Sequence, residues 1–355
     1  MEQRLTKLWY GDAAGAAGFQ PLSWGLQPLS WLYSAVVGVR RSAYSRHWLA
    51  TYRVGKPVIV VGNLTVGGTG KTPLVIWLAR HLTGRGLKVG IVSRGYRSQA
   101  GEAPRLVSSA SNWQDVGDEP LLLHRATGCI TLIGRDRVAA ARALVEQGVD
   151  VIVADDGLQH LRLGRDCELV VVDGTRGFGN GRMLPAGPLR EPVSRVARAD
   201  LIVINGVAEH SSLQSVGIPT QTTTLQMTLL PGAAVRLDGE ESPRSLEEFR
   251  GRPVHAVAGI GNPGRFFRDL RARGLEVIEH PFADHHPFAQ HDLAFGDALP
   301  VLMTEKDAVK CASFADPRLW SVPTAAIFSE TQTRELLDHV LRKIESFRRA
   351  LEVNS

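Results

Sequence analysis

Short runs rich in valine and isoleucine recur through the middle of the chain and alternate with segments of helical periodicity. Between residues 57 and 206 these runs are PVIVVGN, KVGIVSRG, ITLIG, DVIVADD, ELVVVDG and DLIVING. Runs that are apolar at nearly every position are typical of parallel strands covered by helices on both faces of the sheet. The pattern therefore predicts an α/β fold with a mostly parallel sheet, and we assign its core to residues 56–207.

A more polar stretch follows at residues 208–252, with Ser, Thr, Gln, Pro and Gly, and we interpret it as a connecting segment. The alternation then resumes with PVHAVAGIG, LEVIEH, PVLMTEKD and TAAIF, and a helical pattern covers residues 331–351. Residues 253–355 are therefore predicted to form a second, smaller βα region that ends in a helix.

Residues 1–55 have a different character, because they hold four of the seven tryptophans and four of the five tyrosines. The apolar run LSWLYSAVVGV at residues 29–39 is too short to cross a bilayer, and Arg40, Arg41 and Arg46 follow it closely. Aromatic rings and arginines together are typical of a helix that lies in a membrane interface. We predict an N-terminal helical, membrane-associating arm, although a helix packed against protein would have the same composition.

The overall composition is that of a globular protein, with a formal net charge of +5. This mild excess suits an acidic partner such as phosphate or an anionic lipid surface but does not choose among them. The three cysteines, Cys129, Cys167 and Cys311, are far apart, so neither a disulfide framework nor a zinc site is indicated. The first residues lack the pattern of a secretory signal, and no run of about 18 apolar residues occurs. We expect neither export nor a membrane-spanning segment.

The strongest local motif is GNLTVGGTGKTP at residues 62–73, where a buried strand leads into a glycine-rich loop and then an amphipathic helix. Such a loop lets backbone N–H groups surround phosphate oxygens, while its lysine reaches the β and γ phosphates and its threonine can hold Mg²⁺. The chain departs from the usual P-loop pattern, because Thr65 occupies the first glycine position. We predict ATP binding by Thr65, Gly67, Gly68, Thr69, Gly70, Lys71 and Thr72.

Two other P-loop classes are disfavoured by the same residues. Partition-type ATPases carry an extra lysine where this chain has Val66. A GTPase would need an [NT]KxD motif for guanine, and in the nearest candidate, TEKD at residues 304–307, the lysine stands one position late. Adenine is therefore the expected base.

Acidic residues at two strand ends could bind the metal that accompanies ATP. Asp155 and Asp156 end the run DVIVADD, and we predict that they bind Mg²⁺ directly or through water. Gln159 and His160, just beyond them, are candidates for contact with phosphate or acceptor. Asp173 ends the run ELVVVDG in a similar way and is the structural alternative.

Transfer to an alcohol also needs a group that takes the hydroxyl proton. Asp118 and Glu119 stand at the start of a predicted helix, where they could equally be a cap and a favourable charge for the helix dipole. Asp284, His285 and His286 in FADHHPF could form a metal cluster or a capped turn. Sequence spacing cannot bring these two segments together.

A competing motif is GxGxxG at residues 259–264, which follows a predicted strand and has Glu279 at a suitable distance for a ribose contact. It raises the alternative of an NAD-dependent oxidoreductase, although the motif alone is weak. A non-enzymatic P-loop ATPase scaffold is the other alternative, which would show ATPase activity without phosphorylating an acceptor.

Seven ordered segments together resemble a known family, the tetraacyldisaccharide 4'-kinases of lipid A biosynthesis. They are GNLTVGGTGKTP, SRGYRS, GDEP, DDGLQH, GRMLPAGPLREP, FADHHPF and TEKD, and the likeness extends from the N-terminal arm to about Asp307. The family's loop also lacks the first glycine.

The resemblance implies an ATP- and Mg²⁺-dependent kinase, peripheral on the cytoplasmic face of the bacterial inner membrane, that phosphorylates the 4'-hydroxyl of an acylated glucosamine disaccharide. By position it implies that Asp118 is the catalytic base, paired with His285, and that Glu191 is an acid near the metal. Arg94 and Tyr96 would contact the disaccharide. The expected partners are this lipid substrate and an anionic membrane, with neither nucleic acid nor an obligate protein partner.

Overall fold

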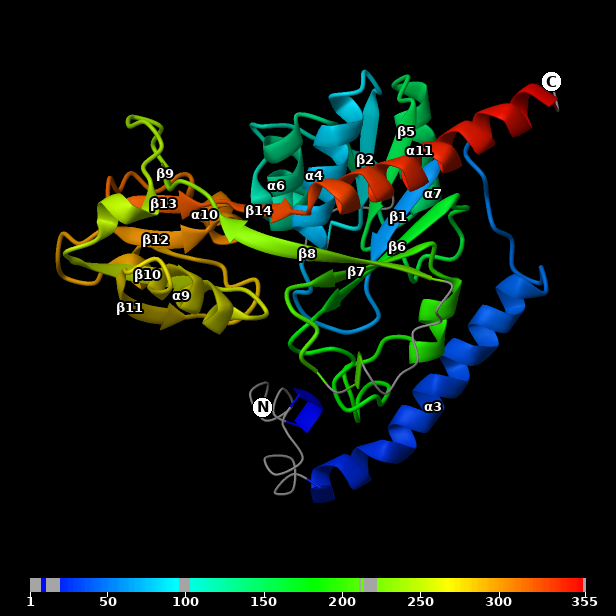
Figure 1. Cartoon of the computed structure of the whole chain (residues 1–355), viewed down its shortest axis with the longest axis horizontal. Helices are drawn as coiled ribbons and strands as arrows, with labels where there is room; N and C mark the ends of the chain where they lie inside the picture. The colour runs from blue at the N-terminus through cyan, green and yellow to red at the C-terminus, as the bar shows by residue number, and fades with distance from the viewer. Residues whose placement is uncertain (1–7, 11–19, 96–102, 211, 214–221, 354–355) are drawn as a thin grey trace.

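The computed structural model describes residues 8–10, 20–95, 103–210, 212–213 and 222–353. Its main element is a nine-stranded sheet in the order β14-β8-β7-β6-β1-β5-β2-β4-β3 (Figure 1). Only the two edge strands, β3 and β14, run antiparallel to their neighbours. The strands are β1 (Val58–Gly62), β2 (Val89–Ser93), β3 (Arg105–Val107), β4 (Ile130–Ile133), β5 (Val151–Asp155), β6 (Cys167–Asp173), β7 (Leu201–Asn205), β8 (Thr223–Pro231) and β14 (Thr324–Ile327). The predicted mostly parallel α/β fold is confirmed.

Helices cover both faces of this sheet, as the apolar runs require. On one face pack α4 (Lys71–Thr83), α11 (Glu330–Val353) and part of α6 (Asp118–Thr127), and on the other α7 (Arg137–Glu146) and the segment 178–199. Every residue of β1, β2, β5, β6 and β7 is buried. The short helices α5 (Trp113–Val116) and η2 (Val193–Arg198) complete this part of the fold.

A second sheet of five strands stands beside the first, in the order β11-β10-β12-β13-β9 (Figure 1). Its strands are β9 (Val235–Arg236), β10 (Pro253–Ala258), β11 (Glu276–Pro281), β12 (Val301–Thr304) and β13 (Leu319–Val322). The helices α9 (Pro263–Arg271) and η3 (Leu246–Phe249) cover one face, and α10 (Glu305–Cys311) and η4 (Gln290–Leu293) cover the other. We refer to these two parts as the large and small domains.

The division of the chain differs from the sequence-based boundaries at two places. The segment 208–252 contains β8, which belongs to the large sheet, and β9, which belongs to the small one. β14 and α11, assigned by sequence to the second region, return to the large domain. β8 was missed because only Leu225 and Met227 of this strand are buried, so it lacks the continuous apolar run of its neighbours.

The N-terminal arm is the long helix α3 (Gln20–Ser45), which lies along the edge of the large domain (Figure 1). Its inner side is fixed by two hydrogen bonds, from Ser30 Oγ to the Met183 carbonyl at 2.8 Å and from Tyr33 Oη to the Arg190 carbonyl at 3.1 Å. Its outer side exposes large apolar side chains, namely Trp24, Leu29, Trp31, Leu32, Val36 and Val39. None of the helices in the described ranges is long and apolar enough to span a bilayer.

Candidate active site

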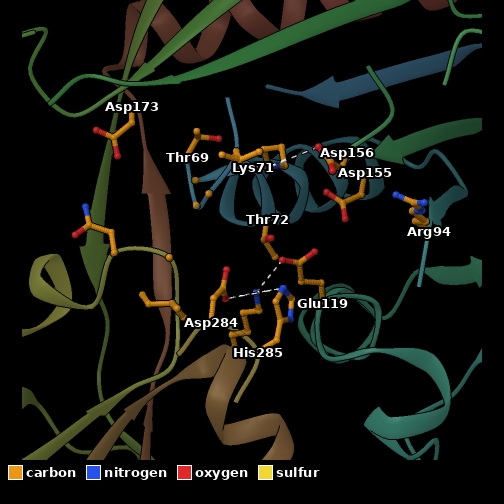
Figure 2. A pocket seen from close by; sticks show the side chains of 18 of the residues that line it. Thr69, Lys71, Thr72, Arg94, Glu119, Asp155, Asp156, Asp173, Asp284 and His285 are labelled. Carbon is orange, nitrogen blue, oxygen red and sulfur yellow. Dashed lines mark hydrogen bonds and ion pairs between the residues drawn. The ribbon is translucent and has the colours of Figure 1, made fainter. Parts of the chain in front are cut away.

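A cleft of about 1120 Å³ lies between the two domains. Its large-domain wall contains the glycine loop, the acidic end of β5 and the start of α6, and its small-domain wall contains the loops after β10 and β11 together with α10. Figure 2 shows Lys71, Thr72, Asp155 and Asp156 gathered on one side, with Glu119, Asp284 and His285 close by. Tyr33, Val37, Arg40 and Arg41 of α3 also line the cleft, so the arm borders its mouth.

The glycine loop connects β1 to α4 in the predicted order. Gly67 and Gly70 adopt φ values of 102° and 94°, a left-handed backbone that glycine reaches without steric cost. Lys71 Nζ donates to Asn63 Oδ1 at 3.0 Å and lies 3.5 Å from Asp156 Oδ1, so its ammonium is held over the loop. Thr65 is buried at the base of the loop and does not line the cleft. Its backbone pairs with Leu189, which supports the loop from behind.

The two acidic residues after β5 have opposite environments. Asp156 forms ion pairs with Arg190 at 2.9 Å and Lys71 at 3.5 Å. Burial opposes ionisation of Asp156, but these two cations outweigh it and hold the pKa of this carboxyl well below its usual range. Burial, with the charges of Glu119 and Asp156, raises the pKa of Asp155 to about 7.

Asp155 has an unsatisfied atom that fits a divalent cation. Its Oδ2 accepts from Ser93 Oγ at 3.2 Å, whereas its buried Oδ1 has no hydrogen-bond partner among the described residues. Carboxylate and hydroxyl oxygens suit Mg²⁺, which usually takes few protein ligands and completes its shell with water and phosphate. Asp155 and Thr72, which both line the cleft, therefore fit a magnesium ion that accompanies a nucleotide.

Asp118 and His285, 167 residues apart, meet across the domain interface. His285 Nδ1 lies 2.9 Å from Asp118 Oδ2. Asp118 is buried and does not line the cleft, whereas His285 does. Burial would raise the pKa of Asp118, but the bond with His285 and the positive charge of Lys306 outweigh it and lower this pKa. An ionised Asp118 thus lies behind an imidazole that faces the cleft.

Most of the other predicted site residues lie on the wall of the cleft. Arg94, Gln159, His160 and Glu191 all line the cleft, and Tyr96 lies outside the described residues. Glu191 Oε1 accepts from Gln159 Nε2 at 3.0 Å. Its buried Oε2 has no hydrogen-bond partner among the described residues, as for Asp155 Oδ1, and lies 3.5 Å from Arg195 Nε and 3.9 Å from Arg41 Nε.

His160 is mostly buried, and its Nε2 has no hydrogen-bond partner among the described residues. Burial and nearby arginines lower its pKa to about 4, so this imidazole is neutral near pH 7. A neutral ring suits contact with a sugar hydroxyl.

Two other acidic segments, at Asp173 and at residues 282–288, were left with alternatives by the sequence. Asp173 Oδ1 accepts from the backbone N–H groups of Thr175 and Arg176 and from Thr175 Oγ1, so it forms a turn. No group of three or more His, Cys, Asp or Glu side chains within the described residues is arranged to hold a metal, which argues against a metal cluster at residues 282–288.

Sequence reasoning missed two charged residues of the cleft. Arg190 makes a two-point contact with Asp156, and Lys306 contacts Glu119, Asp284 and His285. Both stand in segments that carried the family resemblance, GRMLPAGPLREP and TEKD, but nothing in their spacing shows that they line one cleft.

The comparison with known families decides between the remaining interpretations. The family described as Tetraacyldisaccharide-1-P 4'-kinase, LpxK, matches residues 22–342. The chain belongs to this family. It is therefore a kinase, and the alternatives of an NAD-dependent oxidoreductase and of a non-enzymatic scaffold are set aside.

Relatives of the LpxK family cover nearly the whole chain. The tetraacyldisaccharide 4'-kinase of Alkalilimnicola ehrlichii is 50% identical over 315 residues, 89% of this chain and 91% of the relative. That of Stenotrophomonas maltophilia is 50% identical over 308 residues, 86% of this chain and 89% of the relative. A crystal structure of LpxK from Aquifex aeolicus in complex with ATP has a TM-score of 0.75 at 28% identity, covering 91% of this chain and 99% of that one.

Proposed function

We propose that this LpxK family member transfers the γ-phosphate of ATP to the 4'-hydroxyl of a tetraacylated glucosamine disaccharide 1-phosphate. The observation that carries the proposal is that three parts line one cleft: the phosphate loop with Lys71, the carboxylate Asp155, and His285, which Asp118 contacts from behind. Phosphoryl transfer needs little more than a positioned nucleotide, charge compensation and a group for the acceptor proton.

The nucleotide phosphates would lie in the glycine loop at the start of α4. Backbone N–H groups of residues 67–72 and the positive end of the helix dipole would bind phosphate oxygens, and Lys71 would reach the β and γ phosphates. Thr72 and Asp155 would hold Mg²⁺, which neutralises charge on the phosphates when bound. Asp156 holds Lys71 and Arg190 in place and has too many cationic neighbours to favour a direct metal role.

His285 is the group that we propose to take the acceptor proton. The sequence interpretation gave the role of base to Asp118, but this residue is buried behind the imidazole and does not line the cleft. We propose that the 4'-hydroxyl gives its proton to His285 Nε2 while its oxygen bonds to the γ-phosphorus and the bond to ADP breaks. Asp118 would orient the ring and stabilise the imidazolium that forms.

The acceptor headgroup would occupy the part of the cleft bounded by Arg94, Gln159 and His160, which is open toward α3. Gln159 Nε2 donates both to the Asn63 carbonyl and to Glu191, so this wall is fixed to the glycine loop. We therefore propose that Glu191 positions Gln159 through Oε1, while its unpartnered Oε2 stays a candidate for the metal.

We propose that the enzyme docks on the cytoplasmic face of the bacterial inner membrane, and the apolar outer side of α3 supports this. Trp31 is 66% exposed and Leu32 is 64% exposed, whereas Tyr33 on the opposite side contacts the large domain. A helix with such an outer side lies stably in a lipid interface. Because α3 also borders the cleft, an acylated acceptor could enter directly from the lipid.

The function is tested by transfer of label from γ-labelled ATP to a panel of acceptors dispersed in detergent. The panel contains the tetraacylated disaccharide 1-phosphate, the same lipid already phosphorylated at the 4' position, and a free disaccharide. We expect label only in the first lipid. Label released to water with every acceptor, or equal labelling of the lipid whose 4' position is blocked, would refute the proposal.

A further inference from the structure

Residues 8–10, dark blue beside the N-terminus in Figure 1, contact the large domain next to the glycine loop. Trp9 Nε1 donates to the Pro185 carbonyl at 3.0 Å, which ties this segment to the domain. Tyr10 Oη donates to the Val66 carbonyl, inside the glycine loop, at 3.1 Å. The beginning of the chain therefore supports the loop that we assign to the phosphates of ATP.

The ring of Tyr10 also carries a guanidinium group on its face. Arg176 Cζ lies 5.1 Å from the centroid of this ring, within the distance of about 6 Å at which a cation is attracted to an aromatic face. Arg176 stands in the turn after β6, where its backbone N–H and that of Thr175 donate to Asp173 Oδ1 at 3.1 and 3.0 Å. The turn fixes the backbone of Arg176, and the ring of Tyr10 holds its charged end.

The guanidinium of Arg176 lies between two loops that belong to different domains. Its Nη2 donates to the carbonyl of Gly261, in the loop after β10 of the small domain, at 3.1 Å. Its Nη1 is beside Gly67 of the glycine loop, 3.7 Å from the place that a Cβ atom on this glycine would take. A Cβ on Gly261 would lie 2.8 Å from Gly68 N, so the two loops are in direct contact. Arg176 thus stands where the domains touch beside the glycine loop.

We propose that Arg176, held by Tyr10, is a positioning residue that fixes the Gly261 loop against the glycine loop and thereby shapes the ATP site. The inference rests on the proposed function, because it takes the glycine loop as the binding site of the ATP phosphates. Ile260, Gly261 and Asn262 line the cleft, whereas Arg176 and Tyr10 do not. The two residues therefore act on a nucleotide through the loops that they hold.

The kind of contact determines which quantity should change. A hydrogen bond from a charged donor is stronger than one between neutral groups, and the attraction of a cation to a ring is weaker than either when water can reach it. Arg176 should therefore matter more than the ring of Tyr10. A wall that is already in place needs no ordering when ATP binds, so its loss should lower ATP affinity more than the rate at saturating ATP.

The experiment compares Arg176→Met, Arg176→Lys, Tyr10→Phe and Tyr10→Leu in the full chain. Methionine keeps an unbranched stem without charge or N–H donors, and lysine keeps the charge. Phenylalanine keeps the ring of Tyr10 but loses the bond to Val66, whereas leucine loses both. Tyr52→Leu is the matched control, because the ring of Tyr52 carries the guanidinium of Arg162 at 5.1 Å and neither residue lines the cleft.

Two measurements are made without any acceptor. Calorimetric titration gives the Kd for ATP in the presence of Mg²⁺. Hydrogen–deuterium exchange of the nucleotide-free protein, read by mass spectrometry, reports how well the backbone of residues 259–264 is protected. Steady-state kinetics with the acylated disaccharide then give kcat, and thermal unfolding establishes that each variant is folded.

We expect Arg176→Met to raise the Kd for ATP about 10- to 30-fold, with kcat within about threefold of wild type. Tyr10→Leu should raise this Kd about 2- to 5-fold more than Tyr10→Phe does. When each is combined with Arg176→Met, that difference should disappear, because the ring acts through the guanidinium. Exchange at residues 259–264 should be faster in Arg176→Met and in Tyr10→Leu, slower again in Arg176→Lys, and unchanged in Tyr52→Leu.

Three results would overturn the inference: a Kd for ATP within about twofold of wild type in Arg176→Met, unchanged exchange at residues 259–264 in that variant, or an equal effect of the Tyr10 ring with and without Arg176. A raised Kd with unchanged exchange would mean that Arg176 contacts the phosphates directly. If Arg176→Met does not fold, Tyr10→Leu and Tyr10→Phe carry the same measurements, and equal exchange in these two variants would refute the role of the ring.

Failure of this inference can be told apart from failure of the proposed function, because neither ATP binding nor exchange requires the acceptor. If the wild type does not label the acylated disaccharide but the Kd and exchange change as expected, the proposed acceptor is wrong and the role of Arg176 stands. Normal labelling by the wild type together with unchanged exchange in Arg176→Met would refute the role of Arg176 and leave the proposed function standing.

Discussion

Replacement of Gly261 by alanine should weaken ATP binding through a backbone clash between the two domains. Gly261 lies in the loop after β10, and a Cβ atom on it would stand 2.8 Å from the backbone nitrogen of Gly68 in the glycine loop. Carbon makes favourable contacts at about 3.5–4.0 Å, so the two loops would have to separate by roughly 0.7 Å or more. Neither partner is a side chain that could rotate away.

The size of the effect follows from this overlap. Forcing one additional methyl group into a packed contact costs about 1–3 kcal/mol. If this cost falls on the closed, nucleotide-bound arrangement, ATP affinity should fall about 5- to 150-fold, since about 1.4 kcal/mol corresponds to a factor of ten. Arg176 Nη2, which donates to the Gly261 carbonyl at 3.1 Å, would hold the displaced loop against the large domain and prevent it from relaxing freely.

Gly264→Ala is the matched control from the same GxGxxG motif. A Cβ there would meet only the end of the Arg268 side chain, at 3.5 Å, and residue 264 lies in the first turn of α9. Alanine should be tolerated and could add up to about 1 kcal/mol of stability. For both variants, calorimetric titration measures the affinity for ATP and thermal unfolding measures stability. ATP affinity and kcat within about twofold of wild type in Gly261→Ala would refute the proposed clash.

Four further predictions concern the site, the arm and pH. Lys71→Ala should reduce kcat/KM about a thousandfold, equivalent to ~4 kcal/mol, because the phosphates lose the charge that the loop supplies, and near-normal turnover in a folded variant would remove the loop from the mechanism. Asp118→Ala and His285→Ala should each lower kcat about a hundredfold or more, and the double variant should lose less than the product of the two, whereas full additivity would mean that they act separately. Trp31→Ser should reduce co-sedimentation with anionic vesicles at both low and high salt, and unchanged sedimentation would show that α3 is not the anchor. Since burial and nearby arginines lower the pKa of His160 from 6.5 to about 4, the unfolded chain takes up a proton below about pH 6.5 that the folded protein excludes. The free energy of unfolding should therefore fall between about pH 6.5 and pH 4, and it should fall less steeply with pH in His160→Gln. Denaturant titrations at a series of pH values measure this, and the same dependence of the unfolding free energy on pH in both proteins would contradict the prediction.

Features with a local cause could be predicted from the amino-acid sequence alone. The apolar runs predict the central strands because a strand buried on both faces has no polar position, and the glycine loop is recognisable because strand, loop, lysine and helix are consecutive. The acidic end of β5 was found for the same reason, since Asp155 directly follows four apolar residues. The composition of the arm likewise predicts a helix with aromatic side chains, although it does not say which side faces outward.

Relations between distant segments became known only from the folded chain. Asp118 and His285 meet because the two domains face each other across the cleft, and no spacing rule connects positions 167 residues apart. The burial of Asp118 behind His285, and the position of Glu191 beside Arg195 and Arg41, are likewise visible only in the folded chain. Such outcomes depend on which charges become neighbours and how much water is excluded around them. Both are properties of the packed chain and not of any one segment.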